Sequence, residues 1–299
     1  MKSATDPDLT SALPMPADGP STPPTTPDRT EANPLQALRA EIDRLDDALH
    51  GLLMRRAEVV ARLASSRAKG NAPTLRPGRE AQVMRRLLAR HAGPLPRAAI
   101  LRFWRDIFAA STAQQGPFSA VVQAVRPEHV RVAREHFGAL TPLRRVPTPA
   151  LALAMVAAGE ASVAVLPLPE EDEPAEAAWW TRLDSPRLQV AARLPFWTDA
   201  AEPGAEALVV SPGSPDPSGE DRSLLRLEGT AECSRTQLQA ALAAAGLPAR
   251  QLLLRRNGST TIALAELDGV VTAGDPRLAG LPVDHALPLG FYAVPMRGE

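Results

Sequence analysis

The chain has 299 residues and 31 Pro, with 33 Lys and Arg against 34 Asp and Glu; this length predicts two or three domains, and the balanced charge argues against a nucleic-acid or acidic-lipid binder. A single Cys, Cys233, excludes a disulfide framework and a multi-Cys metal site, and the five His show no metal-ligand spacing, so we expect no metal. No apolar run reaches the about 18 residues that a membrane helix needs, and the N-terminus lacks the apolar core of a signal peptide, so we expect a cytoplasmic protein.

The first part of the chain changes character at Asn33. Residues 1–32 are rich in Pro, Ser, Thr and Asp and hold few apolar side chains, which predicts a disordered tail. Beyond Asn33, apolar residues recur at alternating steps of three and four, which predicts one amphipathic helix through Lys69. These residues are Leu35, Leu38, Ile42, Leu45, Leu49, Leu52, Val59 or Val60, and Leu63. At about 1.5 Å per residue the helix is about 50 Å long, so we expect a partner helix from a second chain.

Two further helices complete this part. Apolar residues at helical spacing predict a short helix over residues 78–91 and a longer one over residues 97–115. A Gly-Pro pair follows each of these helices and ends it. Residues 33–116 are therefore predicted to form an all-α N-terminal domain of long–short–long helices.

The remaining residues mix strand and helix patterns. Strands at 118–125 and 161–167 and helices at 127–137 and 149–158 predict an α/β lobe over residues 117–201. Residues 202–222 are rich in Pro, Gly and Asp around a short strand at 207–210, which predicts a connector. Residues 223–299 hold predicted strands at 223–227, 251–255, 260–266 and 287–294 and a helix at 235–245, which predicts an α+β module.

Polar side chains interrupt the apolar faces of the predicted helices. Arg56 and Arg67 are eleven residues apart, and eleven steps of about 100° bring them onto one face. Arg39 is about 25 Å from Arg56 along the helix, so one helix cannot bring both to a small ligand, whereas two antiparallel copies could. Ser111 and Gln115 share a face of the third helix. Each of these residues is also compatible with a solvated helix surface.

The ordered set of these residues resembles a known family. The set comprises Asn33-Pro34-Leu35, Leu38-Arg39, Ile42-Asp43, Leu45-Asp46, Leu52-Leu53, Arg56, Arg67, Pro77, Arg79-Glu80, Ser111 and Gln115. It resembles the all-helical chorismate mutase domain, especially the one that opens bifunctional chorismate mutase–prephenate dehydratases. The resemblance covers residues 33–116 and implies an intertwined homodimer that acts on chorismate without a cofactor.

The resemblance also implies a role for each polar residue. In this family chorismate rearranges to prephenate by an intramolecular Claisen shift, as a step of aromatic amino acid biosynthesis. Arg56 would bind one carboxylate of the substrate, Arg39 of the partner chain would bind the other, and Arg79 would support binding. Glu80 would contact the substrate hydroxyl. Gln115 would face the ether oxygen, and Ser111 would line the pocket.

Two positions depart from the family pattern. Arg67 stands where the family usually has Lys beside the ether oxygen, and Arg is bulkier and is not an equivalent point donor. Arg76 stands where some relatives carry an acidic residue. These departures predict low activity or a repacked site.

The C-terminal half resembles a shortened prephenate dehydratase followed by an ACT-like module. Residues 146–197 resemble one dehydratase lobe, and residues 223–296 resemble a degenerate ACT module. The dehydratase Thr-Arg-Phe motif is absent before Leu208, where Ala205-Glu206-Ala207 stands, so we expect no dehydratase activity. The ACT-like module is expected to act in packing or dimerisation, with an aromatic amino acid effector as the alternative.

Two other functions remain open from the sequence. The helical unit could belong to a non-catalytic or weakly active sensor that dimerises and binds a dianion without turnover. It could also belong to an enzyme that removes pyruvate from isochorismate, because that reaction uses the same fold and a similar cationic pocket.

Overall fold

The computed structural model describes residues 34–67, 74–198 and 204–298, except for the side chain of Arg67. These residues fall into two compact units, one that ends at Leu53 and one that begins at Met54. The expected tail over 1–32 and the expected end of the long helix at Lys69 lie outside the described residues.

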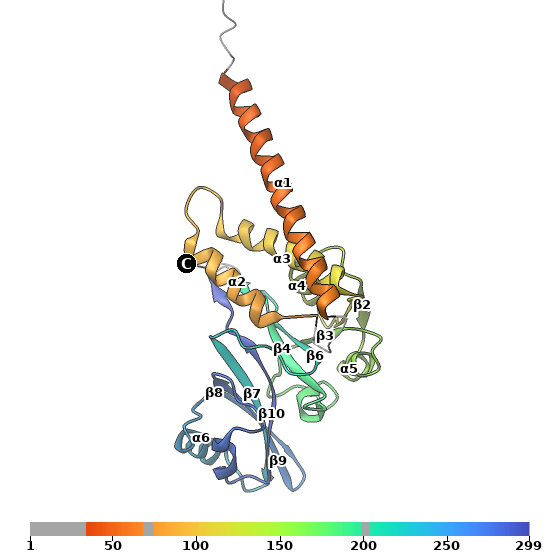
Figure 1. Ribbon diagram of the computed structural model, residues 1–299. Coiled ribbons are helices and arrows are strands. Elements are labelled where there is room, and N and C mark those ends of the chain that lie inside the picture. Colours follow the sequence, from red (N-terminus) through yellow and green to blue (C-terminus); the bar gives the residue numbers. More distant parts are fainter. Residues whose placement is uncertain (1–33, 68–73, 199–203, 299) are drawn as a thin grey trace, which may run out of the picture. The chain divides into compact units, whose positions relative to one another are not determined.

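The elements follow one another from an α-helical part to a sheet-rich part (Figure 1). The helices are α1 (Pro34–Arg67), α2 (Pro77–Arg90), α3 (Arg97–Gln115), α4 (Pro127–Phe137), α5 (Pro149–Ala157) and α6 (Arg235–Ala244), with 3-10 helices η1 (Trp179–Arg182) and η2 (Pro276–Gly280). The strands are β1 (Ala120–Gln123), β2 (Leu143–Val146), β3 (Val163–Pro167), β4 (Leu188–Leu194), β5 (Trp197–Thr198), β6 (Ala207–Pro212), β7 (Asp221–Thr230), β8 (Ala249–Asn257), β9 (Thr260–Asp268), β10 (His285–Ala293) and β11 (Met296–Arg297).

The predicted long helix is confirmed as α1. In the first unit its apolar row consists of Leu35, Leu38, Ile42, Leu45, Leu49 and Leu52. Each of these side chains is more than half exposed. An exposed apolar row of this length is typical of a helix that packs against another molecule.

The second unit is built on a nine-stranded sheet with the order β2-β1-β3-β6-β4-β10-β7-β9-β8. Strands β1, β2 and β3 are parallel, and α4 and α5 connect them. Because side chains alternate across a strand, Val121 of β1 packs with α5, whereas Val122 packs with α4. Helices therefore cover both faces of this part of the sheet, as expected for an α/β lobe.

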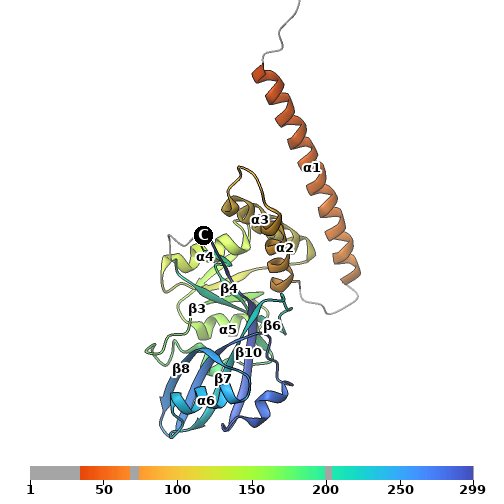
Figure 2. The same ribbon diagram turned by 90° about the vertical axis from the view of Figure 1, so that its left-hand side faces the viewer.

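The last four long strands form the other end of the same sheet. Numbered in chain order from β7 to β10, their spatial order is 4-1-3-2, with every neighbouring pair antiparallel. With α6 after the first strand, this is the succession of a ferredoxin-like split βαβ unit in which η2 replaces the second helix. Figure 2 shows α6, β7, β8 and β10 together at one end of the unit and α2, α3 and α4 at the other.

Helices α2 and α3 pack on one another and on the sheet. Met84 and Leu88 of α2 share an apolar cluster with Leu101 and Phe108 of α3. Phe196, which follows β4, and Ala293, at the end of β10, belong to the same cluster. The helical hairpin is thus fixed to the sheet by buried apolar surface.

The predicted elements agree well with the structure, with some strands missed. Helices α3 and α4 have the predicted bounds, α5 and α6 end one residue earlier than predicted, and α2 is shifted by one residue at both ends. The sequence prediction missed β4, although it lies near the centre of the sheet, and also β2 and the short β5 and β11. Strand β6, predicted within the connector over 202–222, joins β3 to β4 in the sheet. In the part of the chain that the structure describes, no helix is long and apolar enough to cross a membrane.

A buried histidine of α4 makes the stability of this unit depend on pH. His136 is 8% exposed, and burial together with the positive charge of Arg105 holds its pKa well below the usual range. The folded state therefore keeps His136 neutral, whereas the unfolded state binds a proton below about pH 6.5. Stability is lost as the pH falls through this value.

We expect the free energy of unfolding to fall by about 1 kcal/mol more in the wild type than in His136→Gln between pH 8 and pH 5.5. Glutamine does not titrate, so the variant lacks this contribution. Chemical denaturation at the two pH values measures the difference. An equal pH dependence in both proteins would contradict this role for His136.

Candidate functional site

Five of the seven residues that the sequence predicts for the site line one cavity. Arg56, Arg79, Glu80, Ser111 and Gln115 surround a space of about 500 Å³ in the second unit. They come from the last part of α1, the first turn of α2 and the end of α3. The cavity is completed by residues that the sequence did not single out for binding: Val60, Leu63, Thr74, Arg76, Val83, Arg86, Trp104, Phe108 and Thr112.

Arg56 is held in place on the wall formed by α3. Its Nη1 donates a hydrogen bond to Ser111 Oγ, which itself donates to the carbonyl of Ile107 at 2.6 Å. The guanidinium lies 5.7 Å from the ring centre of Trp104 and 6.0 Å from that of Phe108, within cation–π range. Burial lowers the pKa of Arg56, but an arginine stays charged in proteins. A cation is therefore presented to the cavity in a fixed orientation.

The end of α3 adds polar groups beside this cation. Gln115 Nε2 donates to the carbonyl of Ser111 at 2.9 Å, so its amide folds back over the last turn of the helix. Ser111 is buried, with 9% of its surface exposed. The expectation that Ser111 and Gln115 share one face is confirmed, because both line the cavity.

Glu80 is joined to a partner that the sequence analysis missed. Arg105 Nη1 donates to Glu80 Oε2 at 2.8 Å, and the two side chains are only 10% and 13% exposed. Burial raises the pKa of Glu80, and the charge of Arg105 opposes this shift. The signal for Arg105 was present, because it lies between Leu101 and Phe108 on the buried face of α3.

The cavity carries an excess of positive charge. Arg56, Arg76, Arg79 and Arg86 line it, and its single acidic lining residue, Glu80, is already paired with Arg105. Arginine forks match carboxylates in geometry and charge. The arrangement is therefore suited to a small molecule with two carboxylates. Among the described residues, no group of three or more His, Cys, Asp or Glu is placed to hold a metal ion.

Two predicted site residues are not brought to this cavity by the described structure. Arg39 lies in the first unit, where it is exposed on α1. Arg67 is the last residue of α1, and its side chain lies outside the described part of the chain. Their predicted roles remain predictions.

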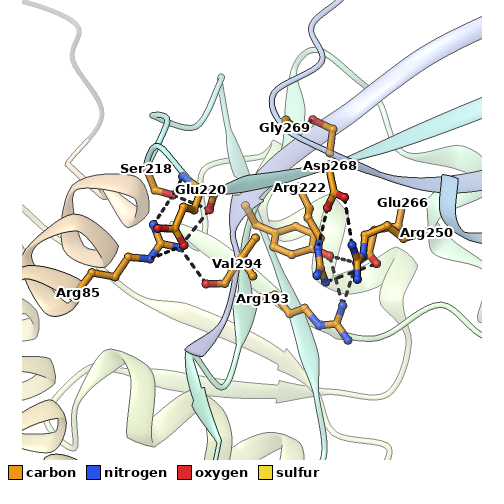
Figure 3. Close-up of polar contacts among 12 residues, drawn as sticks. Arg85, Arg193, Ser218, Glu220, Arg222, Arg250, Glu266, Asp268, Gly269 and Val294 are labelled. Carbon is orange, nitrogen blue, oxygen red and sulfur yellow. Dashed lines mark hydrogen bonds and ion pairs between the residues drawn. The ribbon is translucent and has the colours of Figure 1, made fainter. Parts of the chain in front are cut away.

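A second polar cluster ties the parts of the sheet together. Arg193 of β4 donates to Glu206 at 3.0 Å and to Glu266 of β9 at 2.9 Å, and Tyr292 of β10 donates to the same Glu266. Figure 3 shows Arg193 and Glu266 of this cluster with Arg222, Arg250 and Asp268 around them. Because the buried charges satisfy one another, we assign the cluster a structural role.

Comparison with known proteins places the cavity in a family. Residues 38–116 match the model of the family chorismate mutase type II. The chain is 32% identical to a bifunctional chorismate mutase/prephenate dehydratase of Pseudomonas aeruginosa over 151 residues, 46% of this chain and 40% of the relative. It is 32% identical to the protein of the same description from Aquifex aeolicus over 80 residues, 25% of this chain and 22% of the relative.

The chain thus spans less than half of the length of these two relatives. Among solved structures, a prephenate dehydratase from Streptococcus mutans aligns with 60% of this chain and 100% of its own, at 12% identity and a TM-score of 0.43. The matched range 38–116 contains every residue predicted for the site and the whole of α2 and α3. Residues 38–116 therefore match the chorismate mutase type II family, in a chain that is similar to bifunctional chorismate mutase/prephenate dehydratases.

Proposed function

We propose that this protein rearranges chorismate to prephenate. The observation that carries the proposal is the cavity in which Arg56, Arg79, Glu80, Ser111 and Gln115 meet inside the matched domain. Chorismate carries two carboxylates, and the cavity offers an excess of guanidinium groups. The reaction is intramolecular and transfers no proton to the protein, so the site needs no nucleophile or catalytic base.

The cavity supports this reaction by positioning and by charge. A flexible dianion must be held in a compact conformer, and preformed cation sites achieve this without reorganisation. Arg56 is suited to this task because Ser111 and the ring of Trp104 fix its guanidinium. Arg105 fixes the side chain of Glu80, which also lines the cavity. Glu80 is proposed to contact the substrate hydroxyl there. Gln115 is proposed to face the ether oxygen.

We further propose that the active protein is a homodimer with shared sites. The apolar row of α1 is exposed in the single chain, and a second copy of α1 offers a row of the same kind against which it can be buried. Arg39 lies on the same helix as this row, and in an antiparallel pair it would reach the partner's cavity to bind the second carboxylate. This arrangement would add a cation from the partner chain to those that the single chain already presents.

Dehydratase activity is not part of the proposal. A cavity of about 460 Å³ lies at the carboxyl ends of β1 and β3, where α/β proteins bind ligands. Among the described residues that line it there is no Ser, Thr or Tyr hydroxyl and no Cys thiol. The Thr-Arg pair of Thr181 and Arg182 lies instead in η1, where the Thr181 hydroxyl donates to the carbonyl of Ala178. The described lining of this cavity therefore lacks the hydroxyl that the missing motif would provide.

A weakly active or sensing role is the second candidate, and Arg67 is the observation that favours it. An arginine in place of the usual lysine keeps the charge but changes the donor geometry at the ether oxygen. In that role the ferredoxin-like unit, proposed to be ACT-like, would bind an aromatic amino acid as effector. The two candidates differ in turnover and are separated by the experiments below.

Loss of chorismate absorbance with identification of the product tests the proposed reaction. We expect wild-type turnover to prephenate and a fall in kcat/KM of at least about 100-fold in Arg56→Ala, because one carboxylate would be left without its partner. Arg55→Ala is the matched control, since Arg55 is the exposed neighbour on the same helix and does not line the cavity. A folded wild type with no rate above background would contradict the proposal.

Arg67→Lys tests the second candidate. We expect kcat to rise by about tenfold or more, because a lysine is the better-aimed donor for the ether oxygen. Arg62→Lys, an exposed position on the same helix, is the control and should leave kcat unchanged. A fall of kcat in Arg67→Lys would show that arginine serves the reaction better than lysine at this position. It would exclude the idea that Arg67 weakens the site.

Mixing two inactive variants tests the shared site. Arg39→Ala and Arg56→Ala dimers are each expected to lack activity. After subunit exchange, mixed dimers would contain one intact and one doubly defective cavity, so about a quarter of the wild-type activity should return. If no activity returns although mixed dimers form, the two arginines do not serve one cavity from two chains.

A further inference from the structure

The first turn of α2 is capped by a residue from far along the chain. Pro77 has no amide hydrogen, and the amide of Glu80 donates to the carbonyl of Arg76 at 3.0 Å, so Gly78 and Arg79 carry the two amides without an acceptor in the helix. Asp216 accepts both, from Gly78 at 3.2 Å and from Arg79 at 2.9 Å. Arg76, at the N-cap position, offers no side-chain acceptor of its own.

The same carboxylate also holds a side chain of the cavity. Arg76 Nε donates to Asp216 Oδ2 at 3.1 Å, and Arg76 lines the cavity. The side chain of Asp216 is 16% exposed, so this contact is largely shielded from solvent. One carboxylate therefore fixes two backbone amides and one guanidinium, all within the turn that carries Arg79 and Glu80.

The loop that carries Asp216 is anchored along one face of α2. Gln82 Nε2 donates to the carbonyl of Pro217 at 3.2 Å. Arg85 donates to Ser218 Oγ at 3.0 Å and to the carbonyls of Glu220 and Val294 at 3.0 and 2.9 Å (Figure 3). Gly78, Gln82 and Arg85 lie at steps of four and three and thus share this face.

A neighbouring face of the helix serves the cavity. Arg79, Glu80, Val83 and Arg86 line it, one step round from the residues that hold the loop. The loop in turn is fixed to the sheet, because the amides of Ser218 and Gly219 donate to Asp221, the first residue of β7. One face of α2 is thus fixed to the sheet through the loop, and the next face lines the cavity.

The contact leaves no space for adjustment. A Cβ on Gly78 would overlap the carbonyl oxygen of Asp216, so glycine is required for this close approach. The helix and the loop are therefore fitted to one another at the turn that faces the substrate.

We propose that Asp216 is a positioning residue for the chorismate reaction, which it serves by holding the first turn of α2 so that Arg76, Arg79 and Glu80 keep their places in the cavity. This inference rests on the proposed function. The carboxylate pairs with the guanidinium of Arg76 and accepts from the backbone amide of Arg79, so it caps the helix and holds a cavity side chain at the same time. Without it, the turn would fray and Arg76 would lose its anchor.

Full-length Asp216→Ala and Asp216→Asn test the proposal. We expect kcat/KM for chorismate to fall by at least about tenfold in Asp216→Ala at temperatures well below unfolding, because small displacements in a preorganised site are costly. Asp216→Asn keeps an acceptor but loses the charge, so a smaller loss is expected. Amide hydrogen exchange over residues 77–90 should accelerate in Asp216→Ala.

Asp275→Ala is the matched control. Asp275 caps η2 through the amide of Arg277 at 3.0 Å and pairs with that side chain at 2.6 Å, which is the same chemistry outside the cavity. It should keep wild-type kcat/KM and wild-type exchange over residues 77–90 even if its melting temperature falls.

The outcomes separate this inference from the proposed function. A wild type without chorismate turnover overturns both. With an active wild type, the role of Asp216 is overturned if Asp216→Ala keeps kcat/KM within about twofold, or if Asp275→Ala loses as much. Faster exchange over residues 77–90 with unchanged kcat/KM also overturns it, because Asp216 would then be a helix cap alone.

Discussion

The repulsion among four arginines that line one cavity is the constraint around which this domain is built. Arg56, Arg76, Arg79 and Arg86 surround about 500 Å³. Guanidinium groups that face one cavity repel one another, and contacts within the protein can hold them in place. Arg56 rests on Ser111 and on aromatic rings, and Arg76 rests on Asp216. The folded protein therefore presents a preformed binding site for a negatively charged group.

Much of the helical domain could be predicted from the sequence, because its signals are local. Leucine spacing and Gly-Pro pairs gave α1, α2 and α3, and the family pattern indicated which polar residues would meet. The place of Arg105 on the buried face of α3 indicates that it is buried, but no pattern around it identifies Glu80 as its partner. Strand β4 carries a strand signal that the sequence analysis overlooked, because Leu188, Val190 and Leu194 alternate with Gln189 and Arg193.

The contacts of Asp216 are the clearest case of a feature beyond sequence reasoning. The residue lies in a Pro- and Gly-rich segment that reads as a connector, and its partners precede it by 137 to 140 residues. No pattern around Asp216 indicates helix capping at such a distance. The same holds for Arg193, whose partners Glu206 and Glu266 become neighbours only when the strands of one sheet come together.

The close contact at Gly78 limits which mutations the helical part and the sheet-rich part of this chain can accept during evolution. Because its backbone touches that of Asp216, any larger residue at either contact demands a matching shift in the other. Insertions or deletions in the 213–220 loop would move the acceptor away from the helix that it caps. A helical segment cut off after Gly116 would also lack this acceptor. Helices α2 and α3 and the sheet are thus expected to have been inherited, and to be exchanged between proteins, as a single piece.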